Sequence, residues 1–140
     1  MKTSLDLLLD THIWVRFING DPALPQSIVD AVETARLRGA VHVSVISVWE
    51  VALLVKRARL NLPLGVELWV EGALKLNGID LLPLTPAIAI ETVALPTPMH
   101  KDPADRTLVA SARIERLRLV TLDGEILSFA RDTNLPVLTA

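Results

Sequence analysis

Residues 7–15 read LLLDTHIWV, an apolar run that a single acid ends and a nearly uncharged segment follows. Three consecutive leucines are typical of a strand that is buried on both faces. Asp10 stands where that strand ends, and it is well placed to cap a helix beginning near Thr11. The stretch therefore predicts a buried strand that leads directly into a helix, with a carboxylate at the junction.

The rest of the chain repeats this pattern of short apolar runs followed by longer helical patterns. Strands are predicted near residues 5–9, 41–45, 79–83, 119–122 and 136–138. Such alternation predicts an α/β fold with a central parallel β-sheet of about five strands, flanked by helices on both faces. The turn clusters between elements are too short for interdomain linkers, and 140 residues suit one domain. We expect residues 1–140 to form a single domain.

Composition limits the possible partners. The chain has 14 Lys plus Arg against 16 Asp plus Glu, a net charge of -2, so any binding site for a polyanion must be local. Because the chain has no cysteine, carboxylates or histidines must supply any metal ligands. Asp6 and Asp10 interrupt any signal-peptide core, and no uncharged run reaches membrane-spanning length. We expect a cytoplasmic protein with no membrane partner.

Four acids stand at the ends of apolar segments or interrupt them, namely Asp10, Glu50, Asp105 and Asp123. Ligands of parallel α/β sheets lie just beyond the carboxyl ends of the strands, which is where Asp10 and Asp123 are predicted. Two carboxylates about 4 Å apart repel by roughly 4 kcal/mol at an effective dielectric near 20. A fold that gathers several of them needs a cation, so the pattern suggests a metal site.

Each acid also has a structural interpretation that the sequence leaves open. Asp10 could serve only as a helix cap, and Asp-Gly at residues 123–124 is an ordinary turn signal. Glu50 is the sole charged residue between Val43 and Val55, on a helix that is apolar on every side and therefore expected to be buried. It could form an ion pair with Lys56, Arg57 or an arginine elsewhere in the chain instead of binding a metal.

A helix start is predicted at residues 102–106, which read DPADR. Asp102 has the position of an N-cap before Pro103, and both acids could simply complement the helix dipole. Asp105 shares the inward stripe of Leu108, so we predict Asp105 as the ligand and Asp102 as the cap. The tryptophans at 14, 49 and 69 occupy apolar helical positions and are expected in the core, or at an interface for Trp69.

Four motifs, in order along nearly the whole chain, resemble those of PIN-domain ribonucleases, and especially the VapC toxins of bacterial type II toxin–antitoxin systems. They are LLDTH at 8–12, SVISVWE at 44–50, DPADR at 102–106 and VTLD at 120–123. The resemblance implies a PIN-like α/β fold, an Mg²⁺- or Mn²⁺-dependent endoribonuclease, inhibition by a VapB-type antitoxin and a homodimer.

Residue by residue, the resemblance places Asp10, Glu50 and Asp105 on the family's acidic ligand positions and Asp123 on a fourth, more variable one. Thr11, Ser47 and Thr121 match neighbouring hydroxyl positions that orient the acids or the reacting water. Hard oxygen ligands suit Mg²⁺ or Mn²⁺, which activates water and screens charge on a phosphate. Arg106 adjoins Asp105 and is the predicted RNA-phosphate contact.

Two other functions are compatible with parts of this pattern. A magnesium-dependent phosphoacceptor or phosphatase domain is also α/β with acids at strand ends, but the first strand here lacks the paired acids such sites use. A catalytically silent module that keeps the fold and binds a partner protein is the second alternative. Retention of all four acids argues against this second alternative.

Overall fold

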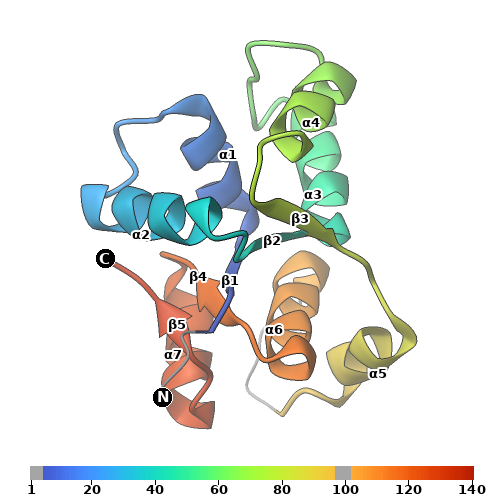
Figure 1. The fold of residues 1–140 in the computed structure, drawn as a ribbon. Helices are drawn as coiled ribbons and strands as arrows, with labels where there is room; N and C mark the ends of the chain where they lie inside the picture. The colour runs from blue at the N-terminus through green and yellow to red at the C-terminus, as the bar shows by residue number, and fades with distance from the viewer. Residues whose placement is uncertain (1–4, 97–101) are drawn as a thin grey trace.

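A computed structural model describes residues 5–96 and 102–140 (Figure 1). The elements, in chain order, are β1 (Leu7–Leu9), α1 (Thr11–Asn19), α2 (Gln26–Leu37), β2 (Val41–Ser44), α3 (Val45–Lys56), α4 (Val66–Leu74), β3 (Ile79–Leu82), α5 (Pro86–Ala94), α6 (Pro103–Glu115), β4 (Arg118–Val120), α7 (Gly124–Thr133) and β5 (Val137–Leu138). The five predicted strands are therefore confirmed, each within two residues of its expected ends.

All five strands belong to one parallel sheet, in the order β3-β2-β1-β4-β5. The leucine run of β1 lies at its centre and pairs with β2 on one side and β4 on the other. Side chains alternate between the two faces of a strand. Leu7 and Leu9 accordingly pack in one core cluster and Leu8 in another, which explains why this strand has no polar residue.

Helices cover both faces of the sheet, as the alternating pattern predicted (Figure 1). The first core cluster joins the sheet to residues of α1, α2, α3 and α4, and Trp14 and Trp69 meet within it edge to face, with ring centroids 5.0 Å apart. The second cluster joins the other face to α6 and α7. Both tryptophans are thus core residues, and the indole nitrogen of Trp69 donates to Asn19 Oδ1 at 2.8 Å.

Helix α3 departs from its prediction. Its apolar sequence suggested complete burial, but only Ser47 and Val51 of this helix are buried, while Trp49 is 49% exposed and Val45 37% exposed. The prediction of Trp49 as a core residue is therefore wrong. Only the side of α3 that carries Val51 reaches the first core cluster, so Trp49 lies on a side that this chain does not cover.

Because the strands are parallel, all their carboxyl ends meet at one edge of the sheet. There Asp10 N donates to Val120 O at 3.0 Å, so the ends of β1 and β4 are joined directly beyond the last ladder pair. Helices α1 and α3 begin immediately after β1 and β2, so this edge carries helix starts and their capping residues. Across the described residues, none of the helices combines the length and apolar character that crossing a lipid bilayer requires.

Candidate active site

Asp10 is the most buried acid of the carboxyl edge, with 5% of its surface exposed. Its Oδ1 accepts from Ile13 N at 2.8 Å, so it is the N-cap of α1, and its Oδ2 accepts from the Thr121 hydroxyl at 2.5 Å. Burial raises the pKa of Asp10, although the two hydrogen bonds oppose that shift. The N-cap hydrogen bond therefore accounts for the position of Oδ1, and the hydrogen bond from Thr121, which follows β4, orients Oδ2.

Thr121 connects two of the predicted acids. Besides donating to Asp10, its hydroxyl oxygen accepts from Asp123 N at 3.0 Å, and the side chain is completely buried. Asp123 in turn caps α7 through a 2.9 Å hydrogen bond from Ile126 N to its Oδ2. The Asp-Gly pair therefore begins a helix instead of forming a turn, and the same segment places Asp123 where its charge acts on Asp10.

Replacement of Thr121 by Val, which has nearly the same shape, should expose the importance of this hydroxyl. The change leaves a buried oxygen of Asp10 without its donor, so we expect the free energy of unfolding to fall by about 2 kcal/mol. Urea denaturation at neutral pH measures this, with Thr121→Ser as the matched control that keeps the hydroxyl. Equal stability of the Val variant and the wild type would show that the hydrogen bond has no net effect.

Glu50 projects from α3 and is half-buried. Burial raises its pKa, the nearby charges of Asp102 and Asp10 raise it further, and a hydrogen bond with Thr11 lowers it. Thr11 also hydrogen-bonds Ser47, with hydroxyl oxygens 2.9 Å apart, so two of the predicted hydroxyl residues lie beside the predicted acid. Among the described residues Glu50 has no ion pair with Lys56 or Arg57, the alternative that the sequence left open.

Asp105 and Asp102 lie in the first turn of α6. Asp102 is the N-cap, because its Oδ1 accepts from Asp105 N at 3.1 Å, as predicted. The pKa of Asp105 is raised to about 8, first by burial and then by the negative charges of four acids, Asp102, Asp123, Glu50 and Asp10. Asp102 therefore adds to the local negative potential, a contribution that its N-cap position in the sequence did not reveal.

The structure thus gathers five acids, here called the acidic cluster, from four separate segments: Asp10, Glu50, Asp102, Asp105 and Asp123. Its potential metal ligands are all carboxylate oxygens, which Mg²⁺, Ca²⁺ and Mn²⁺ prefer. A divalent cation would relieve the mutual repulsion that raises the pKa of Asp105. Among residues 5–96 and 102–140, however, no three acids or histidines already form a closed metal-binding group, so the fit rests on donor chemistry and charge.

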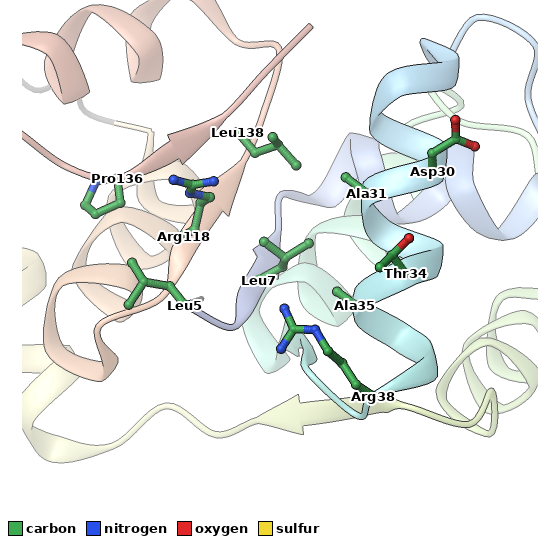
Figure 2. A pocket seen from close by; sticks show the side chains of 10 residues that line it. All are labelled: Leu5, Leu7, Asp30, Ala31, Thr34, Ala35, Arg38, Arg118, Pro136 and Leu138. Carbon is green, nitrogen blue, oxygen red and sulfur yellow. The ribbon is translucent and has the colours of Figure 1, made fainter. Parts of the chain in front are cut away.

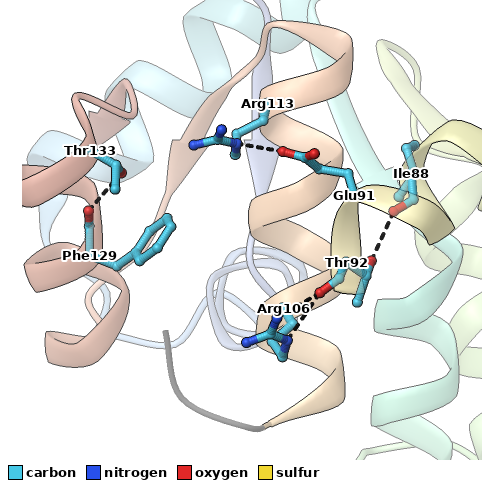
Figure 3. A network of polar contacts seen from close by, with 7 residues as sticks. All are labelled: Ile88, Glu91, Thr92, Arg106, Arg113, Phe129 and Thr133. Atoms are coloured by element: carbon cyan, nitrogen blue, oxygen red, sulfur yellow. Dashed lines mark hydrogen bonds and ion pairs between the residues drawn. The ribbon is translucent and has the colours of Figure 1, made fainter. Parts of the chain in front are cut away.

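Arg106 is oriented differently from the other predicted residues. Its Nε and Nη2 donate to the carbonyl oxygen of Thr92 at 3.1 and 2.8 Å, which ties α6 to α5 (Figure 3). About two turns further along, Arg113 pairs with Glu91 at 2.7 Å across the same two helices. The predicted RNA contact of Arg106 therefore remains a prediction, and the same guanidinium has a structural contact with α5.

Two hollows lie at opposite ends of the sheet. The near hollow, of about 180 Å³, adjoins the acidic cluster and is lined by Asp10, His12, Ile13, Arg16, Leu122 and Asp123. The far hollow is larger, about 810 Å³, and lies where the strands begin, between α2 and the starts of β1 and β4 (Figure 2). The larger hollow contains none of the clustered acids, so size does not identify the site here.

His12 and Arg16 belong to the site but were not predicted as parts of it. They lie four residues apart on α1, and one charge of that helix, His12, lowers the pKa of both Asp10 and Glu50. The signal in the sequence that could have identified them is the spacing of His12 and Arg16, because residues at i and i+4 lie on the same face of a helix. The third histidine, His100, which precedes the DPADR motif, lies outside the described residues.

Known proteins share both the sequence pattern and the fold. The PIN domain family profile matches residues 7–132. Ribonuclease VapC22 of Mycobacterium tuberculosis is 31% identical over 122 residues, which is 87% of this chain and 90% of that protein. These two matches concern the sequence and extend over most of the chain.

Solved structures agree in fold. VapBC2 from Rickettsia felis, bound to a DNA fragment from its promoter, matches with a TM-score of 0.69 at 19% identity, covering 95% of this chain and 97% of that one. DNA-bound VapBC from Salmonella typhimurium matches with a TM-score of 0.68 at 20% identity, covering 97% and 98%. Together with the profile and the curated relative, this likeness shows that the chain belongs to the PIN domain family.

Proposed function

We propose that this protein is a metal-dependent endoribonuclease that acts as the toxin of a type II toxin–antitoxin pair. The observation that carries the proposal is the convergence of acids from four segments on the carboxyl edge of a parallel sheet, in a chain of the PIN domain family. The relative from M. tuberculosis is a ribonuclease, which supports RNA as the substrate. The reaction is hydrolysis of a phosphodiester bond.

We assign the metal-ligand roles to Asp10, Glu50 and Asp105, with Asp123 as a fourth ligand. A bound Mg²⁺ or Mn²⁺ would supply an activated water and screen the charge that develops on the scissile phosphate. The protein's part is to hold its carboxylates in place before substrate arrives. Thr121 fixes one oxygen of Asp10, and Thr11, whose hydroxyl is itself held by Ser47, orients Glu50.

The proposed partners are a VapB-type antitoxin and a second copy of the chain. The solved VapBC structures share the fold, and a further structure of this fold is a toxin–antitoxin complex from Klebsiella pneumoniae, which supports the antitoxin. The exposed apolar side chains of Trp49 and Val45, on a helix adjoining the acidic cluster, support a homodimer that covers them. We further propose that residues 1–140 act as one domain and that the protein works in the cytoplasm.

Cleavage of structured RNAs by the purified protein tests the proposal. We expect cutting with Mg²⁺ or Mn²⁺, none with EDTA, and a fall in rate of about 100-fold in Glu50→Gln, because a group lost from a preorganised site commonly costs that much. Glu67→Gln makes the same chemical change on an exposed part of α4 and should cut normally.

Each other outcome has a distinct meaning. Equal cutting by wild type and a folded Glu50→Gln variant would indicate a contaminating nuclease. Absence of cutting on every RNA, with a folded and metal-supplied protein, would contradict the enzyme and favour the silent partner-binding module. Phosphorylation of Asp10 by acetyl phosphate would instead support the phosphoacceptor alternative.

A further inference from the structure

Arg16 is the permanently charged cation of the near hollow. Of the six residues that line this hollow, two are members of the acidic cluster, Asp10 and Asp123, and two are basic, His12 and Arg16. The hollow lies between the first turns of α1 and the connection from β4 to α7, which contributes Leu122. A phosphate group that approaches the acids from this side meets Arg16 at the wall of the hollow.

The guanidinium of Arg16 has no partner within the described part of the chain. It takes part in none of the ion pairs or side-chain hydrogen bonds there, although the side chain is half-buried. The charges that alter the pKa of Asp10 are those of His12 and Asp123, so the charge of Arg16 is not among those that act on this acid. A half-buried cation beside an acidic cluster, unpaired with it, is free to take an external anion.

Arg106 offers the contrast. Its guanidinium donates twice to the Thr92 carbonyl and so links α6 to α5 (Figure 3). Any phosphate contact by Arg106 competes with these two hydrogen bonds, whereas a contact by Arg16 displaces none in the described residues. The comparison favours Arg16 over Arg106 as the residue that contacts an RNA phosphate.

We propose that Arg16 positions the RNA by binding a backbone phosphate next to the scissile one, and that the RNA strand therefore crosses the near hollow between α1 and the β4–α7 connection. A guanidinium suits this role because its planar donors match two phosphate oxygens. It also offsets the repulsion between the RNA backbone and the acidic cluster. This inference rests on the proposed ribonuclease function.

A purely structural role is the alternative. Arg16 lies in the last turn of α1, where a cation complements the helix dipole. That role would alter the melting temperature but would leave RNA binding by the folded protein unchanged. Arg16→Lys keeps the charge at the helix end and loses the planar fork, so it separates the two roles.

The test compares cleavage kinetics and RNA affinity at several salt concentrations. For Arg16→Ala we expect KM to rise about tenfold with kcat little changed, because one charge-assisted contact to phosphate is lost. The slope of log affinity against log salt should shrink by about 0.7, the value for one phosphate of a single strand. Arg16→Lys should keep the melting temperature of the wild type but recover only part of the affinity, because it lacks the planar fork.

Arg38→Ala is the matched control, since Arg38 is an exposed arginine of the far hollow, at the opposite end of the sheet (Figure 2). It changes net charge equally and should leave KM and the salt slope as in the wild type. An unchanged KM in Arg16→Ala, or an equal weakening in Arg38→Ala, would overturn the proposal.

Affinity is also measured by fluorescence anisotropy in the Glu50→Gln background, which separates this inference from the proposed function. RNA binding that depends on Arg16 in this background, together with a wild-type protein that cleaves no RNA, would support the phosphate contact and contradict the ribonuclease. Metal-dependent cleavage that Arg16→Ala does not change would support the ribonuclease and contradict the phosphate contact. Failure to bind any RNA would contradict both.

Discussion

Asp10→Asn should abolish metal-dependent RNA cleavage while leaving the fold intact. Asn is as good an N-cap as Asp, so the hydrogen bond from Ile13 N is retained and α1 still begins at Thr11. What disappears is a negative charge that is 95% buried among other acids, since only 5% of Asp10 is exposed. Loss of a central carboxylate should weaken metal binding and lower the rate on the order of 1,000-fold, at the upper end for a single preorganised group.

The stability of the metal-free Asp10→Asn protein should not fall with its activity. Burial and the charge of Asp123 raise the pKa of Asp10, which means that its ionised form is disfavoured in the folded protein. Removing the charge should therefore keep or raise the urea midpoint of the metal-free protein. Circular dichroism and urea titration check this beside the cleavage rate. A folded Asp10→Asn enzyme that cleaves within threefold of wild type would sink the assignment of Asp10 as a ligand.

Asp132→Asn serves as the control for this prediction. Asp132 is an exposed residue of α7, and it has no ion pair or side-chain hydrogen bond in the described structure. The chemical change and the change in net charge are identical to those of Asp10→Asn. Its cleavage rate and stability should match those of the wild type, so any difference between the two variants comes from position.

The strands and the acids at their ends were predictable because both depend on local sequence. A buried parallel strand is typically a nearly continuous apolar run, and acids such as Asp10 and Asp123 follow where such a run leaves the sheet. Parallel pairing then places these ends at the same edge of the sheet, and the adjacency of β1 and β4 brings Asp10 and Asp123 together. The order β3-β2-β1-β4-β5 itself was not predicted, because pairing partners are chosen by packing between distant segments.

The features that the sequence did not reveal depend on neighbours in space. Trp49 was expected in the core from its apolar surroundings, yet which side of α3 meets the sheet is set by the direction of the chain after β2. Arg106 adjoins a predicted ligand, but α5 lies close enough to bind its guanidinium. Arg16 has no special sequence context and becomes notable only when β4 and α7 bring Asp123 beside α1.

The metal affinity of the protein should increase steeply with pH up to about 8. The pKa of Asp105 is raised to about 8 in the metal-free protein, so at pH 6 this carboxyl is protonated and must release its proton when it binds a cation. One released proton gives a change of about tenfold per pH unit, hence roughly 100-fold tighter binding of Mg²⁺ at pH 8 than at pH 6. The raised pKa values of Asp10 and Glu50 act in the same direction.

Stability without metal should show the opposite trend. A carboxyl whose folded pKa of about 8 exceeds its unfolded value of 3.8 binds more protons in the folded state across that interval, so the metal-free protein loses stability as pH rises from 4 to 8. Asp105→Asn removes the titrating group, and its stability should vary less over the same interval. Added Mg²⁺ should therefore raise the melting temperature much more at pH 8 than at pH 6.

Isothermal titration calorimetry with Mg²⁺ in two buffers of different ionisation enthalpy measures both the affinity and the protons released. We expect about one proton per cation at pH 6, and in Asp105→Asn a weaker affinity that depends less on pH. Asp132→Asn should behave as the wild type does, because it lies outside the acidic cluster. An affinity that is the same at pH 6 and pH 8 would show that Asp105 is already ionised before the cation binds. A positively charged group of the protein, instead of the metal, would then have to offset the negative charge of Asp105 among the four other acids.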